Sequence, residues 1–234
     1  SRLAVITLDQ VWLFAGVAFI ALRPLLSTIP PHDFWWHMAT GRLIATSGQI
    51  PTVDSFSYTR AGEPFFNQSW LAQLLLYGLH ELGGVPLIVF VQALVLACAY
   101  GLLLRLCIRR TGDVRLSVGF LLLATMPASF DNWVVRPQTY AIPLFIVYLY
   151  VLTRWRGVWI AKFAKVGEKH EREDSNLRKG GREKEEGNRE KEEGGRLLPL
   201  LLLPALGAIW VNLHGSFVLG GALIGLTFVG ELLR

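Results

Sequence analysis

The stretch Val85–Cys107 reads VPLIVFVQALVLACAYGLLLRLC, and its only charged side chain is that of Arg105. A run of about 20 mostly apolar residues is long enough to cross the hydrocarbon core of a bilayer as an α-helix. Similar apolar runs lie on both sides of it, and 52% of the chain is hydrophobic, with a mean hydropathy of +0.40. A soluble domain of this length usually carries more charge. The sequence therefore predicts an all-α, polytopic transmembrane helical bundle.

We predict about six membrane-spanning segments. Their approximate bounds are Val11–Ile29, Val85–Cys107, Leu116–Phe130, Pro137–Thr153, Leu197–Leu213 and Ser216–Leu233. Arginine and lysine in short loops mark the cytoplasmic side of a membrane protein. Such residues precede the first segment, separate the second from the third, and follow the fourth and the sixth. These four places lie on the same side of the membrane if there are six spans. We therefore expect a multi-pass plasma-membrane protein with a cytoplasmic N-terminus.

The charged residues are concentrated in one part of the chain. Between Arg154 and Arg196 lie 13 of the 23 basic and 10 of the 18 acidic residues, including the direct repeat GREKEEG (181–187) and NREKEEG (188–194). Such a segment buries too little apolar surface to offset the entropy of ordering. We expect a disordered or loosely helical cytoplasmic insert over residues 166–195. It separates an N-terminal transmembrane module, residues 1–165, from the last two transmembrane helices, residues 196–234.

The net charge of +5 does not indicate a nucleic-acid-binding protein. Outside the insert, the basic residues lie mostly in short loops beside apolar runs, where they set membrane topology. The partners that we expect are instead membrane lipids.

The long first outer loop, residues 30–84, is predicted to contain two juxtamembrane helices. The first begins after Asp33, which is a suitable N-cap residue, and runs to about Ser47, where Gly48 ends it. The second covers Gln68–Leu82, because its apolar residues recur at helical spacing, and the pair Gly83-Gly84 ends it.

Polar residues of the kind that carry chemistry occur in three outer connections. They are Asp33, His37 and Asp54 in the first, Asp131 and Arg136 in the second, and Asn212 and His214 in the third. Apolar packing does not require ionisable groups from three connections on one side of a membrane, so this distribution predicts a functional site there.

The first connection suits proton abstraction. Asp33 and His37 are four residues apart and therefore share one helical face, and a carboxylate beside an imidazole can take a proton from a hydroxyl group. The alternative is that Asp33 only caps the helix and that His37 is solvated. For Asp54, the alternative to substrate binding is an Asx-turn.

The other two connections suit anion binding. The guanidinium of Arg136 can bind phosphate oxygens in a bidentate manner, although Asp131 and Arg136 could instead pair with each other across the turn. Asn212 and His214 lie at a membrane boundary, where unpaired polar groups are costly. A divalent metal held by His37, His214 and a carboxylate is a further alternative, but nothing in the spacing specifies a metal.

The order of these features resembles the GT-C superfamily of membrane glycosyltransferases, which includes aminoarabinose transferases, protein O-mannosyltransferases and uncharacterised bacterial proteins. The matching stretches are Asp33-Phe-Trp-Trp-His37, Gly48-Gln-Ile-Pro51, Asn67-Gln-Ser-Trp70, Arg136-Pro-Gln138 and Trp210-Val-Asn-Leu-His-Gly215. The resemblance implies a sugar donor on a polyprenyl phosphate, reached from the outer face. It also implies that Asp33 is the catalytic base. The Asp-x-Asp motif of some members is absent, since the sequence reads Asp131-Asn-Trp.

The first hypothesis is therefore an inverting glycosyltransferase. Asp33 would activate the acceptor hydroxyl with the help of His37, while Arg136 and His214 would hold the departing lipid phosphate. Superfamily members usually contain more spans, so the resemblance implies an N-terminal module, half of a split enzyme or a subunit that kept only the fold. The second hypothesis is accordingly a non-catalytic membrane subunit that binds partner helices. A transporter is less favoured, because the apolar segments contain no acidic pair and no inverted repeat.

Overall fold

The computed structural model describes residues 6–29, 33–131, 133–155 and 186–233, and this part of the chain is helical. Its elements are α1 (Leu8–Leu25), α2 (Phe34–Ser47), α3 (Trp70–Thr111), α4 (Val114–Asp131), α6 (Glu186–Leu213), a 3-10 helix η1 (Gly215–Phe217) and α7 (Val218–Leu232). One more helix covers residues 137–155. Between α2 and α3 the only β-type pairing within these ranges is a single antiparallel bridge from Val53 to Pro64. The predicted all-α class is confirmed.

Three helical stretches of the described residues are long and apolar enough to cross a membrane, namely Leu8–Leu25, Trp70–Thr111 and Gly215–Leu232. Two shorter apolar stretches, Val114–Met126 and Leu200–Leu213, accompany them. These helices indicate a membrane protein. The count of about six spans and their orientation stay predictions.

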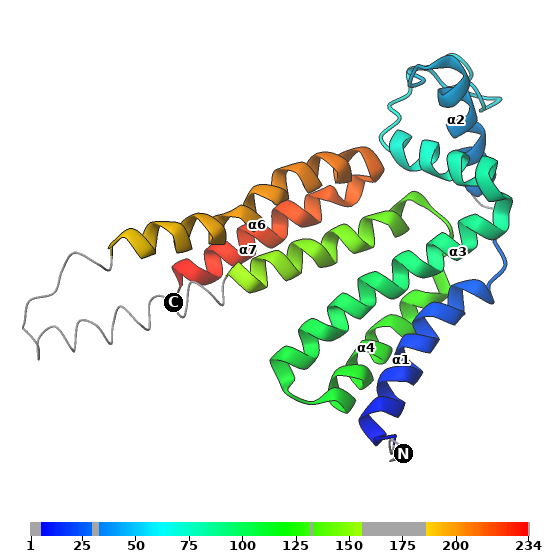
Figure 1. Ribbon diagram of the computed structural model, residues 1–234. Coiled ribbons are helices and arrows are strands. Elements are labelled where there is room, and N and C mark those ends of the chain that lie inside the picture. Colours follow the sequence, from blue (N-terminus) through cyan, green and yellow to red (C-terminus); the bar gives the residue numbers. More distant parts are fainter. Residues whose placement is uncertain (1–5, 30–32, 132, 156–185, 234) are drawn as a thin grey trace, which may run out of the picture.

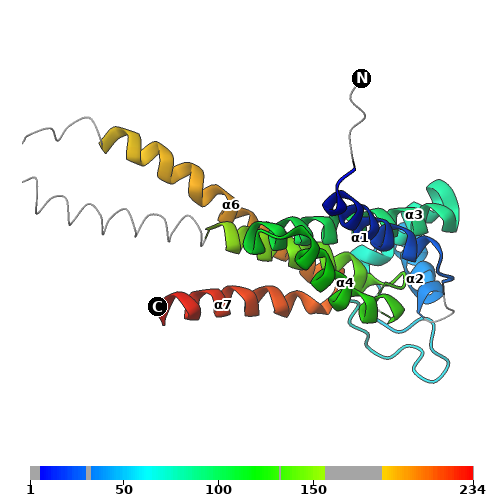
Figure 2. The ribbon, with the colours of Figure 1, turned by 90° about the horizontal axis from the view of Figure 1, so that it is seen from below.

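The helices form two groups that diverge from the end of the molecule carrying α2 (Figures 1 and 2). In the first group α1, α3 and α4 pack together around buried Ile20, Leu96 and Val118. In the second group the helix 137–155 packs on α6 through Tyr148, Leu152, Leu203 and Trp210. Helix α7 joins this second group, since a Cβ atom added to its Gly220 would lie 2.8 Å from the Trp210 ring. Large aromatic and apolar contacts of this kind dominate core packing.

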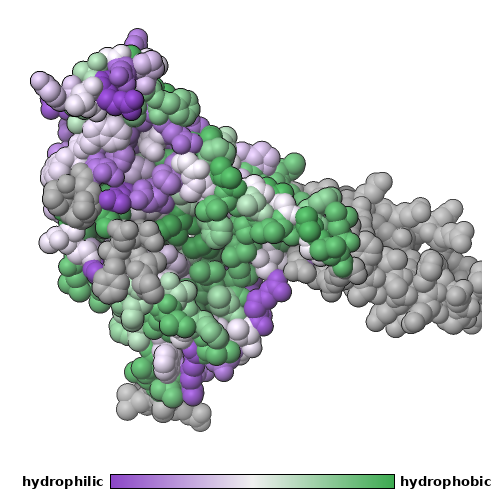
Figure 3. All heavy atoms as spheres, turned by 180° about the vertical axis from the view of Figure 1, so that it is seen from behind, coloured by the Kyte–Doolittle hydropathy of each residue, from purple (hydrophilic) through white to green (hydrophobic). Residues whose placement is uncertain are grey.

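A third core lies where the two groups meet. It joins α2, α3, the helix 137–155 and α6 through the buried side chains of Phe34, Leu76, Tyr140 and Leu213. This core supports the loops that carry the polar residues. On the face in Figure 3, hydrophobic residues cover the middle of the molecule and hydrophilic residues gather at the end with α2.

Two adjacent glycines divide α3 into an amphipathic first part and a long apolar second part. Gly83 has φ −160° and Gly84 has φ 65° and ψ −166°, so neither is helical. Only glycine adopts the Gly84 conformation without strain. The predicted break at Gly83-Gly84 is therefore confirmed.

Helix α2 lies directly on the first part of α3. It ends where Gly48 adopts a left-handed conformation with φ 67°, as the sequence predicts. At Gly41 the two backbones approach so closely that an added Cβ would lie 2.2 Å from the Gln73 carbonyl oxygen. This contact fixes how α2 presents its side chains to α3.

Two boundaries differ from those predicted. Helix α6 begins at Glu186, so residues 186–195 of the predicted insert belong to a helix, and the expected boundary at 196 falls inside it. Glutamate, lysine and arginine are good helix formers, which explains how the charged end of the insert extends the apolar helix. The start of the insert, residues 166–185, lies outside the described residues. Helix α1 covers Leu8–Leu25, a few residues earlier than the predicted Val11–Ile29.

Candidate functional site

Four of the predicted site residues come together at the end of the molecule that carries α2. Asp33 immediately precedes α2, His37 lies in its first turn, Arg136 immediately precedes the helix 137–155, and His214 joins α6 to η1. The electrostatic neighbours that influence the pKa of His37 are Asp33, Arg136 and His214. Three separate connections thus contribute to one cluster, which we call the polar cluster.

An ion pair holds two members of the polar cluster together. The Nε atom of Arg136 lies 3.7 Å from Oδ2 of Asp33, with the arginine side chain 20% exposed and the aspartate 59% exposed. Asp33 occupies the N-cap position of α2, but its side chain makes no capping hydrogen bond to this helix, whose residues are all described. The alternative interpretation of Asp33 as a capping side chain is therefore wrong. Its carboxylate is available to Arg136 and to a ligand.

The Arg136 side chain is not fully satisfied by this contact. Its Nε atom is buried and has no hydrogen-bond partner among the described residues. Charge-assisted hydrogen bonds between nitrogen and oxygen measure about 2.7–2.9 Å, so the 3.7 Å separation from Asp33 is too long to be one. An unpaired buried donor is costly, and an anionic ligand can supply the missing acceptor.

His37 is held by a chain of buried amides. Its Nδ1 atom lies 3.2 Å from Nε2 of Gln73, and Oε1 of Gln73 accepts a hydrogen bond of 2.7 Å from Nδ2 of Asn67. Because the Gln73 oxygen is engaged by Asn67, the Gln73 amide nitrogen donates to His37. The neutral imidazole therefore carries its proton on Nε2, where it is a hydrogen-bond donor.

Burial lowers the pKa of His37 from 6.5 to about 4. The Asp33 carboxylate opposes this shift, whereas the positive charge of Arg136 strengthens it, as does that of His214 at acidic pH, where this imidazole is protonated. His37 is consequently neutral near pH 7. A neutral imidazole with a fixed tautomer positions another group better than it collects a proton, so Asp33 is the better candidate for a base.

His214 is fixed by the 3-10 helix that follows it. Its Nδ1 atom accepts from the backbone nitrogen of Ser216 at 3.1 Å and lies 2.9 Å from the Ser216 hydroxyl, which in turn accepts from Nε1 of Trp210 at 3.1 Å. Burial lowers the pKa of His214 as well. The second imidazole of the polar cluster is thus also neutral and presents its Nε2–H.

Asn212 connects α6 to α3. Its Oδ1 accepts a 2.8 Å hydrogen bond from Nε1 of Trp70, and its Nδ2 donates to the Ala208 carbonyl. This amide has a structural task, and its predicted role in substrate binding stays a prediction.

Asp54 lies apart from the polar cluster. Its carboxylate accepts hydrogen bonds from the backbone nitrogens of Phe56 and Ser57, both at 2.9 Å, and its hydrogen bonds to these two residues lower its pKa. The alternative interpretation, an Asx-turn, is confirmed. The cavity beside it measures about 10 Å³, which is the space of one water molecule. Its substrate-binding role stays a prediction.

The second acidic residue of the prediction, Asp131, is the last residue of α4, and its side chain lies outside the described part of the chain. Within that part, no three or more His, Cys, Asp or Glu side chains are grouped so as to hold a metal ion.

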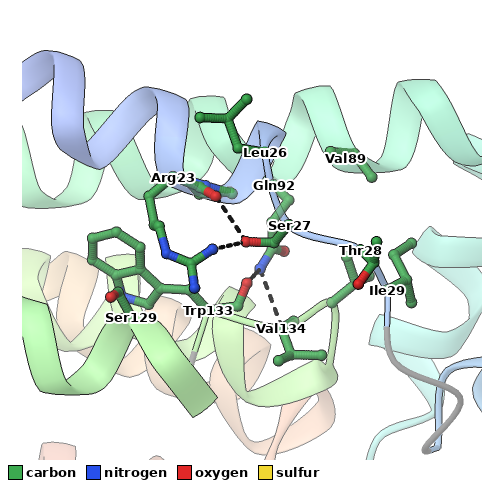
Figure 4. Close-up of a pocket in the computed structure, with 12 residues that line it drawn as sticks. Arg23, Leu26, Ser27, Thr28, Ile29, Val89, Gln92, Ser129, Trp133 and Val134 are labelled. Carbon is green, nitrogen blue, oxygen red and sulfur yellow. Dashed lines mark hydrogen bonds between the residues drawn. The ribbon is translucent and has the colours of Figure 1, made fainter.

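A cavity of about 370 Å³ lies between α1, α3 and the connection that leads to Arg136. Figure 4 shows the Arg23 side chain directed into it, next to Ser129 and Trp133. The Arg23 guanidinium donates to the Ser27 hydroxyl, and Ser129 also lines the cavity. Val135, the neighbour of Arg136 in sequence, also lines this space, which we call the Arg23 cavity. Its volume is within the range of small-molecule sites.

Gln92 is one of the residues that line the Arg23 cavity. Its Nε2 donates to the carbonyl oxygens of Trp133 and Val134, each at 3.2 Å, and its buried Oε1 has no hydrogen-bond partner in the described ranges. The amide thereby fixes the connection between α4 and the helix 137–155, which presents Arg136.

The chain was compared with known proteins. No family model, no curated protein and no solved structure matches it.

Sequence reasoning missed the amides that organise the site. Gln73, Asn67 and Gln92 are buried polar residues of α3 and of the loop before it. A signal for Gln73 and Gln92 was present, because each interrupts an apolar stretch, but only the fold shows which partners satisfy them.

Proposed function

We propose that the protein is a membrane glycosyltransferase, or the N-terminal module of one, that moves a sugar from a polyprenyl-phosphate donor to an acceptor hydroxyl. The chain would cross the plasma membrane about six times, with its N-terminus and charged insert in the cytoplasm. The polar cluster would then face the outer side. The observation that carries the proposal is the Asp33–Arg136 contact at 3.7 Å, next to two neutral imidazoles.

The cluster provides the charges that an inverting transfer needs. The acceptor oxygen attacks the anomeric carbon of the sugar while its proton passes to the Asp33 carboxylate. The bond between the anomeric carbon and the phosphate oxygen breaks, and the phosphate departs with the negative charge. Arg136 holds that charge, and the Nε2–H groups of His37 and His214 are further donors. Groups positioned where charge develops usually make the largest contribution to catalysis.

The surroundings fit a lipid-borne donor. The Arg23 cavity is lined by Val135, the residue before Arg136, and it combines a cation with hydroxyl groups. The helices carry many exposed apolar side chains that a lipid tail can follow. A divalent metal is not needed by this scheme, because the phosphate is neutralised by arginine.

The test is a transfer assay with the protein reconstituted in lipid nanodiscs and a radiolabelled polyprenyl-phosphate sugar. Asp33→Asn and Arg136→Ala should each lower the rate at least about 100-fold, since each removes a group that acts on the transition state. The matched control is Arg60→Ala, which breaks an exposed ion pair with Glu63 in the same loop and should leave the rate unchanged. Transfer that survives both site substitutions would refute the mechanism.

A non-catalytic subunit is the second candidate, and one observation favours it. Only 6% of the apolar span Gly215–Leu232 is buried inside the described protein, so lipid or partner helices must cover α7. In that case the chain should co-purify with other membrane subunits after mild solubilisation. Recovery of an active monomer would exclude this candidate.

A further inference from the structure

A second cavity, of about 360 Å³, lies between the loop that precedes α3 and the last turn of α6. Its wall contains three aromatic rings and three side-chain amides, from Phe65, Phe66, Trp70, Asn67, Gln68 and Asn212. No ionisable side chain of the described residues lines it. We call it the aromatic-amide cavity, and nothing in the mechanism above uses it.

Two of its amides can bind a ligand. The Gln68 side chain makes no hydrogen bond within the described residues, although its Oε1 packs against Gly215, 2.9 Å from where a Cβ would be. Asn67 donates to Gln73 through Nδ2, which leaves its carbonyl oxygen as an acceptor. Asn212, by contrast, is engaged by Trp70 and by Ala208. The cavity therefore offers both donors and an acceptor, without charge.

This combination of groups selects among ligand classes. A phosphate or carboxylate would enter without a cation to balance it, which is unfavourable in a partly desolvated space. A hydrocarbon chain would leave the amides unpaired. A sugar ring satisfies both kinds of wall, because its hydroxyl groups exchange hydrogen bonds with amides and its C–H faces stack on aromatic rings. The volume suits one or two sugar rings.

We propose that the aromatic-amide cavity binds an uncharged carbohydrate, and that this carbohydrate is the acceptor of the transfer reaction. The first statement stands on the cavity alone, and the second rests on the proposed function. The two sites are neighbours in the fold, because Asn67 at the cavity wall is hydrogen-bonded to Gln73, which contacts His37 in the polar cluster.

The competing explanation is that these aromatic residues only anchor the loop in the lipid headgroup region, where such side chains are common. Two exposed aromatic residues of the same loop separate the explanations. The Phe66 side chain is 86% exposed and lines the cavity, whereas Tyr58 is fully exposed and does not. Neither substitution removes a buried contact, so both variants should fold.

The experiment uses the full chain in phosphatidylcholine nanodiscs, which avoids sugar-based detergents. Saturation-transfer NMR is recorded with glucose, galactose, mannose, N-acetylglucosamine, cellobiose and chitobiose as probes. At least one probe should bind with a millimolar Kd, and Phe66→Ala and Gln68→Ala should each weaken it about tenfold. Tyr58→Ala and Gln49→Ala, an aromatic and an amide outside the cavity, should bind as the wild type does.

Absence of binding by every probe would overturn the proposal. So would equal weakening by Phe66→Ala and Tyr58→Ala, which would show that the loop acts only through its membrane contact. Binding should persist in Asp33→Asn, because Asp33 does not line the cavity. If sugar binds but Asp33→Asn transfers normally, the proposed mechanism fails and the carbohydrate site stands.

Discussion

The close approach of α2 to α3 at Gly41 makes a quantitative prediction. In Gly41→Ala the new methyl group would lie 2.2 Å from the Gln73 carbonyl oxygen and 2.9 Å from Cβ of Tyr77. Neither neighbour can yield easily, because one is helix backbone and the other is the root of a side chain. Helix α2 must therefore move away from α3.

The magnitude follows from three contributions. Overpacking of a well-packed contact costs about 1–3 kcal/mol. The displacement also stretches the buried hydrogen bond between Gln73 and His37, which adds about 1–2 kcal/mol. The better helix propensity of alanine returns about 1 kcal/mol. The free energy of unfolding should fall by about 1–4 kcal/mol.

The assay is thermal unfolding in nanodiscs, followed by circular dichroism, with Gly78→Ala as the matched control. Gly78 lies in the same part of α3, and a Cβ added there meets no atom of the described residues within 4 Å. This control should be unchanged or more stable by up to about 1 kcal/mol. If Gly41→Ala unfolds at the same temperature as Gly78→Ala, the described packing of α2 on α3 is wrong.

Three further predictions concern the same region. Because the pKa of His37 is lowered from 6.5 to about 4, the unfolded chain binds the proton first as the pH falls. The contribution of His37 to the free energy of unfolding should be unchanged above pH 6.5 and should decrease by about 3 kcal/mol at most between pH 6.5 and 4. Thermal unfolding measured across this pH range should show the loss in the wild type and not in His37→Gln. Trp70→Phe removes the hydrogen-bond donor to Asn212 and should lower the free energy of unfolding by about 1–2 kcal/mol. Amide hydrogen exchange at the end of α6 should become faster, and unchanged exchange there would contradict the hydrogen bond between α3 and α6. Gly84→Ala forces a conformation with positive φ on alanine and should lower the free energy of unfolding by about 1–3 kcal/mol. Gly101→Ala, which has open space around it among the described residues, should not lower it, and chemical denaturation can measure both variants.

The sequence predicts the local features of this fold because their causes are local. Gly48 ends α2 through its left-handed backbone, and Gly83-Gly84 interrupts α3, as their positions between apolar runs indicate. The end of the insert was harder to predict, since a charged repeat can be either a solvated coil or the extension of a helix that an apolar segment has already nucleated. Here the apolar part of α6 decides between the two, and the helix extends back to Glu186.

Four of the seven predicted site residues meet in the structure, but their pairing could not be predicted. The polar cluster contains Asp33, His37, Arg136 and His214, all identified from the sequence. The structure places Arg136 beside Asp33, about a hundred residues earlier in the chain, and nothing in the sequence indicates this pairing. Contacts across such separations depend on how helices pack, and no periodicity or spacing encodes them.

The pair of glycines within α3 has a consequence for how such a protein can diversify. Gln73 and Trp70 belong to the first part of α3, which contacts both the polar cluster and the aromatic-amide cavity, while the part beyond Gly84 is the long apolar segment. Since the backbone is not continuous helix across the break, a tilt or rotation of the first part need not be transmitted to the second. Substitutions that reshape the first part of α3 can therefore accumulate without changing how the apolar part fits the bilayer. The break at Gly83-Gly84 thus allows ligand binding and membrane insertion to evolve separately within one continuous segment.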